Sequence, residues 1–147
     1  YNVNWLRTEF NTAHNFSFGA RQWLDFQADK DLFPLLRYDT VGDDRVRTEH
    51  EKLDGIVRHI DDKFWKTYFP PNGFNCRCDV TAHEKGDLKF TPKSIIDKLE
   101  PVAELFAFNP GVDKIIFNNE AHPYLKVADR YKVLKENNFG LDVPPKP

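Results

Sequence analysis

The spacing of apolar residues in the first 29 positions constrains the fold more than any other feature of the sequence. Apolar side chains recur every three or four residues there, and Ser17 is the one gap in the series. The members of the series are Val3, Leu6, Phe10, Ala13, Ala20 and Leu24. This period predicts an amphipathic helix, whose apolar face is widened by Trp5, Phe16 and Trp23. Gly19 weakens such a helix by up to about 1 kcal/mol relative to alanine, so we expect a bend or a close packing contact there.

Two short segments rich in β-forming residues follow the predicted helix. The run 35–41 ends at Gly42, and the run 55–60 begins at Gly55, so turn residues adjoin both runs. This pattern predicts two short strands. The polar stretch 45–54 between them predicts a loop or a short exposed helix.

Residues 76–83 alternate between inward-type and polar side chains. Cys76, Cys78 and Val80 share one face, which predicts a third strand with both thiols facing inward. An aromatic cluster at 64–69 precedes this strand and is ended by a Pro-Pro-Asn-Gly turn signal. A disulfide between thiols one residue apart would be badly strained, so we expect two free cysteines.

The last third of the chain predicts mainly helix. Thr91 and Pro92 form a helix start, with Thr91 as the N-cap. The expected buried stripe of this helix, which Pro101 should kink or divide, consists of Ile95, Ile96, Leu99, Val102, Ala103 and Phe106. A turn at 109–111, a strand at 114–117 and a last helix at 123–137 complete the expected elements.

Together these elements predict the α+β class, with a long N-terminal helix plus a short, mostly antiparallel sheet and packed helices. We expect one domain over residues 1–147. Within it we expect a helical lead-in at 1–30, a motif-bearing core at 34–90 and C-terminal helices at 91–140. The sequence contains no Met, so we interpret it as a fragment of a longer chain.

Charge and hydropathy argue against two kinds of partner. Lys and Arg total 21 against 23 Asp and Glu, so the global charge gives no support for nucleic-acid binding. No apolar run approaches the ~20 residues that cross a bilayer, and the first residues lack the pattern of a signal peptide. We therefore expect no membrane contact, and direct contact with DNA stays an unsupported alternative.

Four ordered sequence blocks lie between Arg37 and Val80. They are Tyr38-x-Thr40-x-x-Asp43, His50-x-x-Leu53-Asp54-Gly55, Asp62-x-x-Trp65 and Pro70-Pro71-x-Gly73-x-x-Cys76-Arg77-Cys78. In this order the blocks resemble the central region of the Mu F-like head morphogenesis family of phage minor head proteins. The helical lead-in is compatible with the same family but is less specific.

The resemblance implies a structural minor head (capsid) protein of a tailed phage or prophage, not an enzyme. Its expected partners are the portal protein and other head proteins, and its expected role is to assist head assembly or DNA delivery. The expected location is the virion, in the head interior or at the portal, after assembly in the bacterial host cytoplasm. One alternative is a virion-carried effector or enzymatic domain, because members of this family can be fused to toxin modules. Another is a zinc-stapled protein-interaction module unrelated to phage.

The resemblance also raises the question of a metal. In similar sequences a Cys-x-x-Cys precedes Leu-Asp-Gly, and here Arg47 and His50 stand at those two positions. His50, Cys76 and Cys78 are therefore three candidate zinc ligands, since zinc prefers imidazole and thiolate donors. The candidates for a fourth ligand are His83, His59 and Asp54.

Two interpretations without a metal stand beside zinc. The one we favour from the sequence is a pair of packed thiols with a hydrogen-bonded His50, which implies no cofactor. The other is a reactive Cys76 with His50 as its base and Asp54 orienting the imidazole. A catalytic thiol needs an exposed, activated position, whereas Cys76 lies beside Val80 on an inward face, so we expect no catalytic residue.

Overall fold

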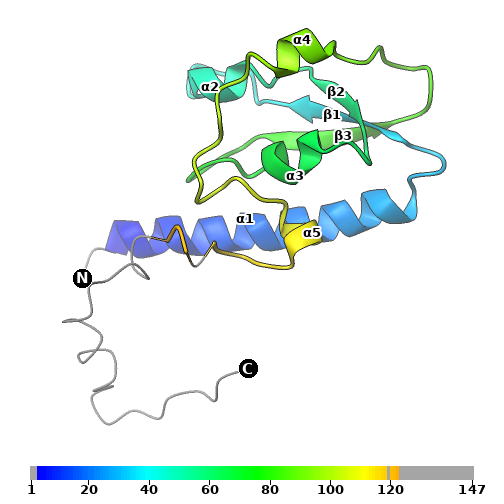
Figure 1. The fold of residues 1–147 in the computed structure, drawn as a ribbon. Coiled ribbons are helices and arrows are strands. Elements are labelled where there is room, and N and C mark those ends of the chain that lie inside the picture. Colours follow the sequence, from blue (N-terminus) through cyan, green and yellow to red (C-terminus); the bar gives the residue numbers. More distant parts are fainter. Residues whose placement is uncertain (1–2, 119, 123–147) are drawn as a thin grey trace.

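A long helix lies alongside a small antiparallel sheet in the computed structural model, which describes residues 3–118 and 120–122 (Figure 1). The strand order is β2-β1-β3, with β1 (Leu35–Asp39) between β2 (Val57–His59) and β3 (Asp79–His83). Both neighbouring pairs are antiparallel. The predicted α+β class, with a long N-terminal helix and a short antiparallel sheet, is confirmed.

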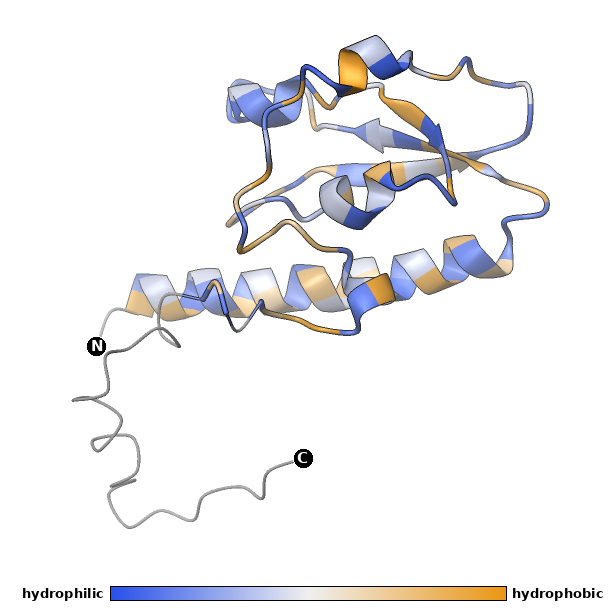
Figure 2. Cartoon of the chain, in the orientation of Figure 1, coloured by the Kyte–Doolittle hydropathy of each residue, from blue (hydrophilic) through white to orange (hydrophobic). Residues whose placement is uncertain are grey.

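The helix α1 (Val3–Ala28) matches the predicted one, but it buries a different face from the regular apolar series. Its buried residues are Thr12, Phe16, Gly19 and Trp23. Four large members of the series are instead exposed by 46% to 71%, namely Val3, Leu6, Phe10 and Leu24. Figure 2 shows apolar positions spread along the whole of α1 rather than gathered on the side that faces the sheet.

Close approach explains which face of α1 is buried. A Cβ atom added at Gly19 would lie 3.0 Å from the backbone oxygen of Pro70, so the helix and the loop touch here as the sequence predicts. One turn further on, the ring of Trp23 packs edge-on against Phe69 at 5.2 Å between centroids. Burial of the large Phe16 and Trp23 rings on this face therefore accounts for the rotation of the helix.

The predicted strand 76–83 begins only at Asp79, so both cysteines precede it. The central strand β1 ends at Asp39, directly opposite Asp79, and leaves no partner backbone for earlier residues. The expected alternation nevertheless continues upstream, since Cys76 is buried and Arg77 is exposed. The other two predicted strands are also correct in place but shorter than expected.

The described residues also form four short helices: α2 (Thr48–Glu51), α3 (Phe64–Tyr68), α4 (Lys93–Ile96) and α5 (Pro110–Asp113), of which α5 lies against α1. The first lies in the stretch expected to be a loop or a short helix. The second carries the predicted aromatic cluster into the core, where Trp65 is fully buried. Within the described residues, no helix is both long and apolar enough to cross a membrane.

Several predictions for the C-terminal third are wrong. The helix expected from Thr91 to Phe106 is reduced to the single turn α4, because Thr91 does not cap it. The Thr91 hydroxyl instead accepts a hydrogen bond from the Val57 amide at 3.0 Å, which ties this segment to β2. Ile95, expected in the buried stripe, is 48% exposed.

The segment after Phe106 also differs from expectation. The predicted turn at 109–111 is the start of α5, whose first amides are capped by the Asn109 side chain. Residues 114–117 form no strand, since Lys114 adopts a left-handed conformation as it leaves the helix. The last helix expected at 123–137 lies outside the described residues.

The core has two parts. The larger one lies between the sheet, α3 and Trp23, and its buried members are Trp23, Leu36, Tyr38, Leu53, Ile56, Ile60, Phe64, Trp65, Phe69 and Val80. The smaller one contains Phe16, Phe106 and Phe108, and it fixes the C-terminal segment against α1. The segment that carries both cysteines contacts α1, because the Asn15 side chain donates to the Cys76 carbonyl at 3.3 Å, and it contacts α2 through His50.

Candidate metal centre

His50 is brought into the interior by the single turn α2. The backbone of the turn begins at Arg47, whose carbonyl accepts hydrogen bonds from the amides of His50 and Glu51 at 2.9 Å. Leu53, one turn later, is buried in the main core and keeps this side of α2 inward. The His50 side chain is therefore buried although its neighbours Glu49 and Glu51 are exposed.

The two cysteines reach His50 because the loop before β3 is tightly folded. Asn72, itself buried, donates to the Phe69 carbonyl and accepts a hydrogen bond from the Tyr38 hydroxyl at 2.8 Å. Asn75 then adopts a positive φ of 54°, and the Cys76 amide donates back to the Gly73 carbonyl. This turn aims both sulfur atoms at the same side of the loop.

The structure brings together the three residues named from the sequence. The Nδ1 atom of His50 lies 3.7 Å from Sγ of Cys76 and 3.6 Å from Sγ of Cys78. The one nitrogen and two sulfur atoms all lie within 4.8 Å of one another. His50 is 5% exposed and Cys76 is 6% exposed, and both cysteines are free thiols.

The pKa values of the two thiols shift in opposite directions. The hydrogen bond with the Cys78 thiol, helped by one with His50, lowers the pKa of Cys76 against the effect of burial. The same hydrogen bond, together with burial, raises the pKa of Cys78. The hydrogen bond between the two sulfur atoms therefore makes Cys76 the more acidic thiol of the pair.

The residues expected as a fourth ligand lie elsewhere. Among the described residues, no further histidine, cysteine or carboxylate joins the cluster. Asp54 accepts hydrogen bonds from the amide and hydroxyl of Thr40 at 2.7 and 2.8 Å. His83 pairs with the Thr81 hydroxyl, and His59 accepts a hydrogen bond from the Asp61 amide. Asp54 is thus also not the group that would orient His50 for catalysis.

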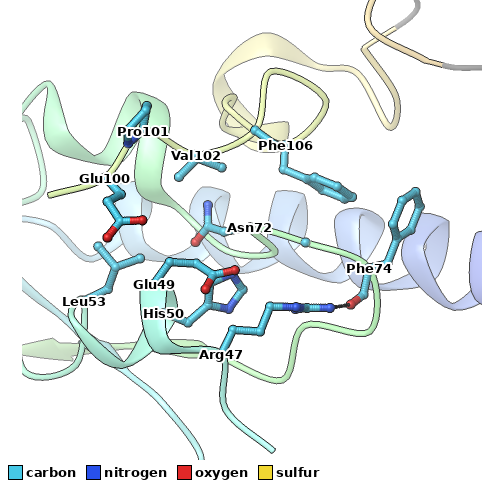
Figure 3. A pocket seen from close by; sticks show the side chains of 12 residues that line it. Arg47, Glu49, His50, Leu53, Asn72, Phe74, Glu100, Pro101, Val102 and Phe106 are labelled. Atoms are coloured by element: carbon cyan, nitrogen blue, oxygen red, sulfur yellow. Dashed lines mark hydrogen bonds between the residues drawn. The ribbon is translucent and has the colours of Figure 1, made fainter.

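Arg47 occupies the position next to the cluster where a further ligand would fit. Its guanidinium donates to the Phe74 carbonyl at 2.6 Å, so it ties α2 to the cysteine loop without binding a sulfur (Figure 3). A cavity of about 20 Å³ is lined by Arg47 together with all three candidate ligands. The sequence identified the position of Arg47 but not this contact.

A larger pocket of about 400 Å³ opens beside His50 (Figure 3). Its walls come from α2, the loop at 72–74 and the segment 100–106. His50 and Arg47 line both the pocket and the small cavity. The sequence analysis missed Asn72, which lines this pocket and holds the cysteine loop, because an Asn after two prolines has the pattern of an ordinary turn residue.

Comparison with known proteins identifies relatives over somewhat more than half of the chain. "Putative capsid assembly protein F" of Escherichia phage Mu is 39% identical over 84 residues, which are 57% of this chain and 19% of that protein. "Mu-like prophage FluMu F protein" of Haemophilus influenzae is 36% identical over 77 residues, 52% of this chain and 19% of that protein. The chain thus spans about a fifth of the length of these relatives. No solved structure matches it.

The matched region contains the elements that build the candidate site. A family model described as "Phage Mu protein F like protein" matches residues 2–81, which include α1, β1, β2 and all three candidate ligands. This match covers more than half of the chain and agrees with the motif blocks between Arg37 and Val80. The chain therefore belongs to the Phage Mu protein F like family.

Proposed function

We propose that this chain is part of a structural minor head protein of a tailed phage or prophage. In this proposal it contacts the portal protein and other head proteins, assists head assembly or DNA delivery, and stays in the virion after assembly in the host cytoplasm. Family membership supports the proposal, because a relative at 39% identity carries the name "Putative capsid assembly protein F". The shared region is the folded sheet and α1 rather than a peripheral extension.

The observation that carries the contact is the exposed apolar face of α1. Val3, Leu6 and Phe10 follow one another at helical spacing and are exposed by 67%, 46% and 71%. Leu24 continues the same face near the other end of the helix and is 56% exposed. Apolar side chains gathered on one face are typical of a protein-binding surface. We propose that this face, called the outer face of α1, packs on the portal protein.

The size of the surface suits such a contact. Burying one large apolar side chain contributes roughly 1.5–3 kcal/mol before the costs of association are subtracted. Val3, Leu6 and Phe10 have the spacing of the anchors in complexes where a helix lies in a groove, and Leu24 lies about 21 Å further along the same face. The portal-binding surface in this proposal is apolar, so a charged residue in place of Phe10 should weaken the contact.

A substitution in the outer face tests the proposal. Phe10→Glu should abolish co-purification with portal rings, because it places a charge in an apolar contact, and should leave the thermal unfolding midpoint unchanged since Phe10 is exposed. Phe90→Glu is the matched control, because Phe90 is 55% exposed but lies outside α1. Equal retention of portal by wild type and both variants would refute a contact through α1, and no portal retention by wild type would refute the portal as partner.

We also propose that the chain has a structural and not an enzymatic role. The Cys76 thiol, whose pKa is lowered by its hydrogen bonds with Cys78 and His50, is only 6% exposed. A nucleophilic thiol has to meet its substrate, so this burial supports a structural use of the cluster. Labelling of the Cys78→Ser variant, in which Cys76 is the single thiol, tests the point: slow labelling of the native chain and fast labelling after denaturation are expected.

A further inference from the structure

We propose that His50, Cys76 and Cys78 bind one zinc ion, with water in the fourth position. The inference is independent of the proposed role in the phage head. It rests on the positions of three donor atoms, the charge balance of a buried site and a cavity next to it. The favoured expectation from sequence was packed thiols without a metal, and the geometry points instead to a metal site.

The distances between the donor atoms resemble those in a zinc site. Zinc binds sulfur at about 2.3 Å and imidazole nitrogen at about 2.05 Å, and a tetrahedral angle between these bonds separates nitrogen and sulfur by about 3.6 Å. The observed separations from His50 Nδ1 are 3.7 Å to Cys76 and 3.6 Å to Cys78. The same geometry separates two sulfur ligands by about 3.8 Å. The cluster is no wider than 4.8 Å, so the two sulfur atoms would approach each other by at most about 1 Å on binding zinc.

The sulfur atoms of Cys76 and Cys78 both face the Nδ1 atom of His50. A neutral imidazole nitrogen either donates one proton or offers one lone pair, so it forms one good hydrogen bond. A simple packed pair would place one sulfur close to Nδ1 and the other farther away. Two nearly equal separations, 3.7 and 3.6 Å, are those expected when all three atoms surround a common centre.

The net charge of a zinc-bound cluster suits a buried site. Two thiolates and a neutral imidazole around a divalent cation give a site with no net charge, which is the arrangement that burial favours. His50 and Cys76 are almost completely buried, so water does little to solvate an unbalanced charge there. Soft sulfur ligands with imidazole select zinc over magnesium or calcium, which prefer oxygen.

The cavity of about 20 Å³ supplies the fourth position. It is lined by His50, Cys76 and Cys78, and its volume is that of about one water molecule. The candidate protein ligands Asp54, His59 and His83 are bonded elsewhere. Three protein ligands and one water is a known coordination of zinc, and it leaves a position that a partner's side chain could fill.

Such a centre would hold the fold together at a particular point. It links α2 to the loop before β3, two segments that the strand pairing does not join. Arg47 already ties the same segments through the Phe74 carbonyl, but at an exposed position. Zinc binding would therefore contribute directly to the free energy of folding of the cysteine loop.

Metal analysis of the full 147-residue chain tests the proposal. The chain, purified without a metal-affinity step and dialysed against zinc-free buffer, should retain about one zinc per molecule. His50→Ala, Cys76→Ser and Cys78→Ser should each reduce this content several-fold, whereas His83→Ala, which removes a histidine outside the cluster, should not. Less than about half an equivalent in the wild type, also after incubation with zinc, would overturn the proposal.

Cobalt substitution keeps the test valid where a variant fails to fold. Wild-type chain stripped by a chelator and loaded with Co²⁺ should show the intense visible bands of a tetrahedral centre and a near-ultraviolet band of sulfur-to-cobalt charge transfer. Both bands should disappear when zinc is added in equal amount. A weak octahedral spectrum without the sulfur band would show cobalt bound elsewhere and would overturn the assignment of the ligands.

Discussion

Two regions pack against the rest of the molecule in different ways: the sheet-forming segment 34–83 and the segment 91–118 that follows it. In the first, backbone ladders join β1 to both neighbours, and the side chains between them form the main core. In the second, the backbone hydrogen bonds are mostly local turns, and a few side chains anchor it, namely Phe106, Phe108 and Asn109. Strand pairing distributes stability over many residues, whereas anchoring concentrates it in a few.

The largest expected effect lies in the first region. Trp65→Ala should lower the free energy of unfolding by about 3–5 kcal/mol, because the side chain is fully buried and its removal leaves a large cavity. It also removes the hydrogen bond from the indole nitrogen to the His59 carbonyl. Urea denaturation followed by circular dichroism measures the change, with Phe90→Ala as an exposed control expected within about 0.5 kcal/mol of wild type. A loss below about 1 kcal/mol would show that this core does not dominate stability.

The second largest effect on stability is expected for the Asn109 side chain, which lies in the second region. Asn109 is fully buried, caps α5 and donates to the Trp65 carbonyl at 3.1 Å. Asn109→Ala removes the cap and leaves a buried carbonyl unpaired, so a loss of about 2–4 kcal/mol is expected in the same assay. Asn118→Ala is the matched control, since Asn118 also accepts from nearby amides but is only partly buried, and it should cost less than about 1 kcal/mol. Similar losses for the two variants would show that the buried Asn109 contributes no more to stability than a partly buried capping residue.

A cysteine in place of Arg47 should strengthen zinc binding at the proposed metal centre. Arg47→Cys places a thiol one helical turn before His50, beside the small cavity, and should raise zinc affinity at least about tenfold, or about 1.4 kcal/mol. Competition with a chelator measures the affinity. Arg21→Cys, on the exposed side of α1, adds a thiol far from the cluster and should change nothing. An affinity for zinc that is unchanged by Arg47→Cys would place the open position away from residue 47.

The difference between the regions also explains which features could be predicted from the sequence. The period of two around Val80 and the turn residues that flank β1 report directly on strand pairing, so the sheet and its inward thiols were predictable. The meeting of His50 with the cysteines was predictable as a hypothesis from the motif, but its geometry depends on the left-handed turn at Asn75. That turn has no periodic signal.

The wrong predictions share a physical cause. Thr91 and Pro92 have the pattern of a helix start, but the Thr91 hydroxyl is used by β2 instead of by a helix. Long-range hydrogen bonds of this kind override local preference, since each is worth as much as a cap. The segment then follows the positions of its anchors, Phe106 and Asn109, which a search for helical period does not detect.

The smallest expected effect concerns the outer face of α1. Phe10→Ala should change the free energy of unfolding by less than about 0.5 kcal/mol, because Phe10 is 71% exposed, although it lies in the most regular apolar series of the chain. Phe16→Ala, six residues further on the buried face, should cost about 3 kcal/mol or more, since its ring stacks on Phe108 at 4.7 Å. Denaturation of the isolated chain compares the two. If both cost the same, α1 is rotated in solution and its apolar series faces the core; if only Phe16 matters, that series is free to meet a partner.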